Sequence, residues 1–105
     1  MSKRLEMLEK LIEAGSKDPF HHYARALELR SLGQAQAALG ALERVIGEFP
    51  EYVPSYLIAA QLGVELGDGA RARAFCDQGL LAARRARNDH AEAELMELLG
   101  SLPGG

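Results

Sequence analysis

A pattern of glycine, alanine and leucine positions recurs in the sequence at an interval of 34 residues. Shifting the chain by that interval aligns Gly33 with Gly67 and Ala38 with Ala72. The same shift aligns identical or similar residues at further positions: Ala26, Leu32, Leu42 and Ile46 with Ala60, Leu66, Cys76 and Leu80. Self-similarity at a period of this length is typical of repeat architectures, in which successive units stack on one another.

The residue types indicate what each unit is made of. The chain has 17 Ala and 17 Leu, but only three Val, three Ile and no Thr. Strands favour β-branched and aromatic residues, whereas helices favour Ala, Leu, Glu and Arg. Six β-branched residues cannot furnish a normal sheet, so we expect an all-α fold.

Hydrophobic spacing and end signals predict about six helices. Asp18-Pro19 is a typical helix start, and Gly33 and Gly67 are expected to end helices. Asp89 and Glu92 have the spacing of a capping box, which predicts that Asp89 caps the last helix. The expected helices cover about residues 3–14, 19–32, 35–48, 54–66, 70–87 and 89–99.

These helices are expected to form one domain over residues 1–102, because no linker is long enough to divide the chain. Within it we expect an N-terminal flanking helix (1–18), a first repeat (19–52), a second repeat (53–87) and a C-terminal capping helix (88–100). Residues 103–105 are expected to be a fraying tail.

The repeated unit resembles the tetratricopeptide repeat family, and in particular a small bacterial-type protein with two repeats. The resemblance covers residues 19–86 and rests on Leu32-Gly33, Ala38, Leu42 and Pro50, and again on Leu66-Gly67, Ala72 and Cys76. It implies an α-solenoid of antiparallel helix pairs that acts as a protein-binding scaffold.

Some positions depart from the family pattern. Arg25 and Ala59 stand where Leu is usual, Gly63 replaces a bulky aromatic residue, and the second repeat has Arg84 in place of Pro. These departures affect individual positions and leave the period, the turn glycines and the small-residue pairs intact.

Residues of the types that carry out chemistry in other proteins have simpler structural explanations here. The segment Gly67–Ala72 imitates a dinucleotide-binding fingerprint, but a predicted helix precedes it where that fingerprint needs a strand. His21 and His22 are adjacent on a helix and point about 100° apart, so they do not readily share a metal. Cys76 occupies a packing position of the repeat, which favours a buried thiol. We therefore expect no enzyme activity, no cofactor and no metal site.

Charge and hydropathy exclude two further classes of partner. Residues 70–88 carry a net charge of +4 and residues 89–105 a net charge of −4, so the acidic last helix is expected to lie beside the basic one. This neutralisation argues against nucleic-acid binding. No apolar run approaches the roughly 18 residues of a transmembrane helix, and the N-terminal residues lack the apolar core of a signal peptide. We expect a cytoplasmic protein that binds neither nucleic acid nor membrane.

The resemblance also implies where a partner binds, since the first helix of each tetratricopeptide unit lines the concave face. The matching positions here are Phe20, Tyr23, Leu27, Arg30, Leu57, Gln61 and Val64. We expect this face to bind a peptide or helix of another protein through apolar anchors. A clamp for a C-terminal carboxylate is not expected, because the groove positions that hold Lys and Asn in such family members are here Tyr23, Leu27, Leu57 and Gln61.

Two alternatives involve the same face. In the first, a structural homodimer buries it without a separate ligand; in the second, the chain's own terminal helices or tail cover it.

Overall fold

Six α-helices follow one another through short turns in the computed structural model, which describes residues 2–103. They are α1 (Lys3–Glu13), α2 (Pro19–Ser31), α3 (Ala35–Glu48), α4 (Pro54–Glu65), α5 (Gly69–Arg85) and α6 (Asp89–Ser101). No strand occurs in residues 2–103, so the predicted all-α class is confirmed. The predicted tail lies outside the described residues at Gly104 and Gly105.

Glycines form the turns that the repeat pattern predicts. Gly15, Gly33 and Gly67 have φ angles of +92°, +78° and +74°. Glycine adopts this left-handed region without steric cost, and there it lets the following amides bond to the last carbonyls of the helix. After α4, for example, the Gly67 amide donates to Val64 and the Asp68 amide donates to Gly63.

The turn between α5 and α6 differs from the prediction. Helix α5 ends at Arg85, and Arg87 takes the left-handed conformation with φ 54°. The cap of α6 is Asn88, whose Oδ1 accepts a hydrogen bond from the Ala91 amide at 3.0 Å. The prediction that Asp89 caps α6 is therefore wrong, because Asp89 is already the first helical residue.

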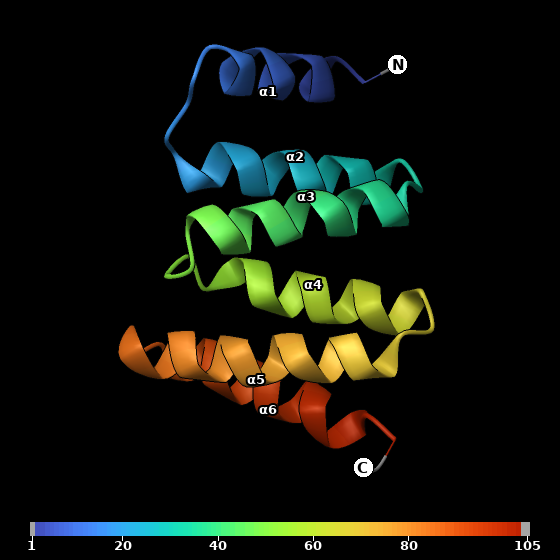
Figure 1. Cartoon of the computed structure of the whole chain (residues 1–105), viewed down its shortest axis with the longest axis vertical. Helices are drawn as coiled ribbons and strands as arrows, with labels where there is room; N and C mark the ends of the chain where they lie inside the picture. The colour runs from blue at the N-terminus through green and yellow to red at the C-terminus, as the bar shows by residue number, and fades with distance from the viewer. Residues whose placement is uncertain (1, 104–105) are drawn as a thin grey trace.

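The helices stack in chain order, each one packed against the next (Figure 1). Helix α4 also contacts α6, so the last helix returns to the face of the stack to which α4 belongs. In Figure 1 α6 accordingly lies partly behind α5.

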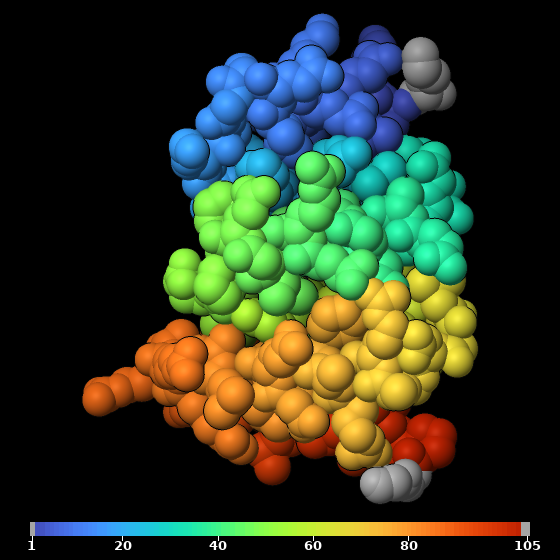
Figure 2. All heavy atoms as spheres, in the orientation of Figure 1, coloured from blue at the N-terminus to red at the C-terminus, as the bar shows by residue number. Residues whose placement is uncertain are grey.

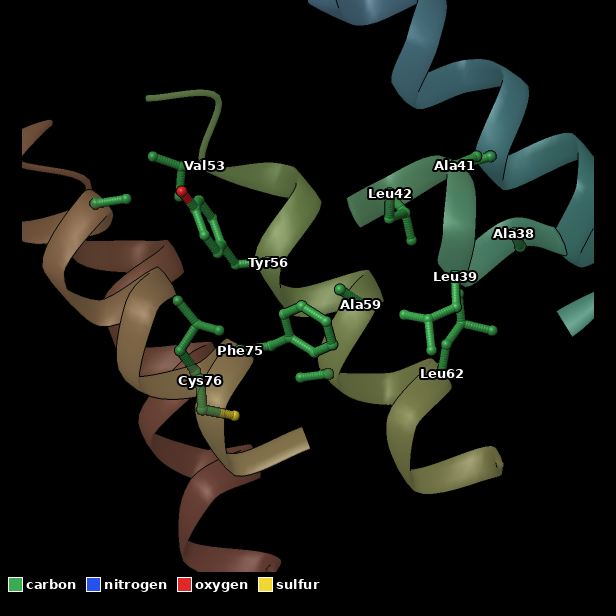
Figure 3. Packing of buried hydrophobic residues seen from close by; sticks show 14 of the residues in the cluster. Ala38, Leu39, Ala41, Leu42, Val53, Tyr56, Ala59, Leu62, Phe75 and Cys76 are labelled. Carbon is green, nitrogen blue, oxygen red and sulfur yellow. The ribbon is translucent and has the colours of Figure 1, made fainter. Parts of the chain in front are cut away.

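Helix α4 lies at the centre of the hydrophobic core. In Figure 3, Leu62 of α4 lies beside Leu39 of α3, and Ala59 of α4 lies beside the ring of Phe75 of α5. The aligned small residues are fully buried at 0% exposure: Ala26, Ala38, Ala60 and Ala72. The predicted burial of Cys76 is confirmed, and that burial raises the pKa of its thiol, with a smaller contribution from Asp77.

Two glycines, one on α4 and one on α5, allow these two helices to pack closely. A Cβ atom placed on Gly63 of α4 would lie 3.1 Å from the Cβ of Ala72, and one placed on Gly79 would lie 2.6 Å from the Cβ of Tyr56. Real Cβ atoms essentially never approach as closely as 2.6 Å, so glycine at position 79 permits the observed spacing of α4 and α5.

The terminal helices bury fewer residues than the central helices do. Helix α1 buries only Leu8, and its Glu9 carboxylate pairs with Arg25 at 3.4 Å. Helix α6 buries only Leu95, and its Glu92 carboxylate accepts a hydrogen bond from Arg84 Nε at 2.6 Å. The latter contact confirms that the acidic last helix lies beside the basic one.

Candidate functional site

The residues predicted for the concave face lie on α2 and α4 and remain accessible. Phe20 and Val64 are 51% and 46% exposed, and the other five are partly buried. Within the described residues 2–103, this face is therefore at least partly accessible to solvent, and the terminal helices do not cover it completely.

Two adjoining pockets run along this side of the molecule, where α2, α4 and α6 meet. The first has a volume of about 220 Å³ and is lined by Tyr23, Val53, Pro54, Leu57, Ile58, Asn88, His90, Ala91, Glu94 and Leu95. The second has a volume of about 260 Å³ and is lined by Leu57, Gln61, Glu94, Glu97, Leu98 and Ser101. Because Leu57 and Glu94 line both pockets, the two form one continuous depression, which we call the α2–α4–α6 groove.

Three of the seven predicted residues line this groove: Tyr23, Leu57 and Gln61. Leu57 lies where the two pockets join. The other four, Phe20, Leu27, Arg30 and Val64, do not line it.

Arg30 ties α2 to α4. Its guanidinium donates to Gln61 Oε1 at 3.0 Å and to Glu65 Oε2 at 2.7 Å. The Glu65 carboxylate thus balances the positive charge of Arg30. Arg30 consequently positions Gln61 at the edge of the groove.

Tyr23 lines the first pocket of the groove and packs against a second tyrosine outside it. The rings of Tyr23 and Tyr52 are tilted by 60° with centroids 5.4 Å apart. Burial raises the pKa of Tyr23, followed by the effect of Tyr52, and the charge of Glu94 contributes a smaller increase against the opposing charge of Arg30. The Tyr23 hydroxyl therefore stays protonated and is available as a hydrogen-bond donor.

The contribution of α6 to this face was not among the predictions from the sequence. Ala91, Glu94 and Leu98 line the groove from this helix, at a spacing that places them on one helical face. A signal was present, because the 34-residue shift that aligns Tyr23 with Leu57 also leads from Leu57 to Ala91.

The opposite side of the molecule carries a different surface. Figure 2 shows a face built mainly from α1 (blue), α3 (green) and α5 (orange). A pocket of about 490 Å³ is lined by residues of α3, α4 and α5 and of the turns that follow α3 and α5, among them Ile46, Glu51, Leu81 and Arg85. It contains both a carboxylate and a guanidinium, and α2 and α6 do not contribute to its lining.

The turn between α1 and α2 brings together Ser16, Asp18 and His21. The Ser16 hydroxyl lies 2.7 Å from His21 Nδ1, but His21 Nε2 lies 3.9 Å from the Asp18 carboxylate, beyond hydrogen-bond distance. Ser16 Oγ also accepts a bond from the Asp18 amide, and Asp18 Oδ1 accepts one from the Phe20 amide. These bonds hold the turn and cap α2, and they do not form a proton relay.

Residues that often bind metal are dispersed. Within residues 2–103 no group of three or more His, Cys, Asp or Glu side chains is placed to hold a metal ion. In the same part of the chain no helix has the length and apolar character needed to span a membrane.

Comparisons with known proteins identify the architecture. The sequence pattern of the family described as tetratricopeptide repeat matches residues 29–95, more than half of the chain. The crystal structure of a tetratricopeptide repeat domain protein from Salinibacter ruber is 29% identical, with a TM-score of 0.75, covering 78% of this chain and 92% of that one. The solution structure of a protein from Bordetella parapertussis is 24% identical, with a TM-score of 0.80, covering 95% of this chain and 87% of that one, and shows the fold alone. No curated protein matches significantly.

Proposed function

Because the chain belongs to the tetratricopeptide repeat family, whose members are in general protein–protein interaction modules, we propose that it binds a peptide or helix of another protein along the α2–α4–α6 groove. In this proposal the protein is a non-catalytic adaptor that requires no cofactor. The cytoplasmic location and the role as a scaffold stay predictions, as do the boundaries of the two repeats.

The observation that supports this proposal most is the continuity of the groove across three helices. Its walls include Leu57, Ile58 and Leu98, which pack against the core but are only partly buried. Binding sites are typically concave surfaces with apolar walls and a few polar groups. A segment lying in this groove would cover those side chains and meet polar groups at Tyr23 and Gln61.

The same surface extends beyond the groove. Phe20 and Val64 are the most exposed of the residues predicted for the concave face, and they lie on α2 and α4. We assign them, with Leu27, to contacts at the margin of a bound segment. The groove itself provides the apolar anchor sites.

A random-peptide library displayed on phage tests the proposal without a known partner. The wild-type protein is expected to enrich peptides that Leu57→Glu does not bind, because that change places a charge where the two pockets join. Leu81→Glu is the matched control, since Leu81 is 55% exposed on α5 outside the groove. Peptide binding by this control is expected to equal that of the wild-type protein.

A second variant covers the case in which Leu57→Glu does not fold. Ala91→Phe fills the groove from α6 without adding a charge, and circular dichroism checks that the helices remain. Enriched peptides that bind Ala91→Phe and wild type equally would contradict the proposal, as would a library that yields no binder. Sedimentation distinguishes the homodimer: a wild-type dimer that Ala91→Phe dissociates supports that alternative instead.

A further inference from the structure

The groove is lined by carboxylates that no lysine or arginine neutralises. Glu94 and Glu97 both line its second pocket, and their spacing of three residues places them on one face of α6. In the described part of the chain Glu94 forms an ion-pair contact only with His90, at 3.2 Å, and Glu97 forms none. His90 is itself 86% exposed and carries a full charge only when protonated.

Lysine and arginine side chains do not line the groove. None of the described residues that line either pocket is Lys or Arg. Arg30, the nearest guanidinium on α2, is engaged by Glu65 and Gln61, while Arg84 and Arg71 pair with Glu92 and Glu43. The groove therefore presents negative charge beside apolar walls that include Leu57, Ile58 and Leu98.

We propose that the segment bound in the α2–α4–α6 groove is a cationic amphipathic peptide, with Lys or Arg side chains against Glu94 and Glu97 and apolar side chains against Leu57 and Ile58. This inference rests on the proposed function and specifies the chemistry of the partner. Opposite charges across an interface favour the correct partner and its orientation, and like charges exclude acidic segments.

Tyr23 adds a second feature that suits such a segment. It stands at the opposite side of the first pocket from α6, and its ring is only partly buried. An aromatic face attracts the guanidinium of arginine or the ammonium of lysine. A cationic side chain that enters the first pocket thus meets an aromatic ring on α2 and a carboxylate on α6.

The experiment uses the peptides enriched from the random library by the wild-type protein. Their mean net charge is expected to be positive, and the binding of a synthetic representative, measured by fluorescence anisotropy, is expected to weaken as ionic strength rises. Glu94→Gln combined with Glu97→Gln should weaken binding about tenfold, as expected for the loss of two exposed charge pairs.

The control is Glu6→Gln combined with Glu13→Gln on α1. It changes the net charge by the same amount at the opposite end of the stack, and it should leave binding unchanged. Equal weakening by both double variants would overturn the inference, because the effect would then come from net charge alone.

Failure of this inference differs from failure of the proposed function. Peptides that require Leu57 but are neutral or acidic, or that bind Glu94→Gln/Glu97→Gln as tightly as wild type, would overturn the cationic partner alone. Peptides that bind without regard to Leu57 or Ala91 would overturn both proposals.

A second copy of this chain is the other candidate occupant. Helix α1 exposes Lys3 and Lys10 beside Met7 and Leu11, with Glu6 on the same surface, so it is amphipathic and carries a net positive charge there. Wild-type self-association that Lys3→Glu/Lys10→Glu abolishes would replace the separate partner by a second protomer and overturn the inference as stated.

Discussion

Gly79 shows how one residue controls the spacing of three helices. A Cβ atom there would lie 2.6 Å from the Cβ of Tyr56 on α4 and 2.9 Å from Cδ1 of Leu95 on α6. Gly79→Ala should therefore destabilise the protein by about 1–3 kcal/mol, because overpacking outweighs the better helix propensity of alanine. Urea unfolding followed by circular dichroism measures the change.

Gly40 provides the matched comparison. It lies in the interior of α3, and nothing lies within 4 Å of a Cβ atom placed on it. Gly40→Ala should stabilise the protein by about 0.5–1 kcal/mol through helix propensity alone. If Gly79→Ala stabilised the protein to the same extent, the close approach at Gly79 would be refuted.

At the scale of a single element, the start of α6 depends on Asn88. Its side chain accepts a hydrogen bond from the Ala91 amide, whereas Asp89 is already inside the helix. Asn88→Ala should cost about 1 kcal/mol of stability, the usual effect of removing a capping side chain. Thermal unfolding monitored at a helical wavelength checks this value.

The variant Asp89→Ala distinguishes the effect of the capping side chain on stability from the effect of a negative charge near the start of α6. Asp89 is in the first turn of α6, where its carboxylate interacts favourably with the helix dipole. Its removal should cost less than the loss of Asn88, and the cost should shrink as salt is added. A larger loss of stability for Asp89→Ala than for Asn88→Ala would instead indicate that Asp89 is the N-cap, as the capping-box spacing predicted.

Over the whole molecule, stability is expected to vary along the stack. Helix α4 contacts α3, α5 and α6, whereas α1 packs mainly on α2 and buries only Leu8. In an array of this kind each unit is stabilised by its neighbours, so a terminal helix opens at lower free energy. Hydrogen exchange followed by mass spectrometry should show α1 amides exchanging faster than α4 amides.

The same argument identifies a control within the chain. Helix α5 is packed against both α4 and α6, so its amides should be protected like those of α4. Equal protection of α1 and α4 would mean that the stack opens only as a single cooperative unit.

Several features were predictable because short-range signals encode them. The period of 34 residues, the turn glycines and the shortage of β-branched residues predicted six helices in antiparallel pairs, as found. The resemblance to the tetratricopeptide repeat family also implied that Tyr23, Leu57 and Gln61 share a face. Helical spacing supports this for Leu57 and Gln61, because residues four positions apart lie on the same side of a helix.

Other features required the packed structure. Arg30 meets Glu65 across two helices, 35 residues apart in the chain, and no local pattern reveals that the charge of Arg30 is already balanced. The choice of Asn88 rather than Asp89 as the cap depended on where α5 ended, with Arg87 in the left-handed conformation.

The sequence by itself thus determined the helices, their pairing and one wall of the candidate binding face. Only the tertiary structure decided that α6 forms the other wall and brings Glu94 and Glu97 opposite Tyr23 and Leu57. The physical reason is that helix periodicity acts over a few residues, whereas the groove depends on how closely helices approach. That approach depends on the packing of residues distant in the chain, such as Gly79 against Tyr56 and Leu95.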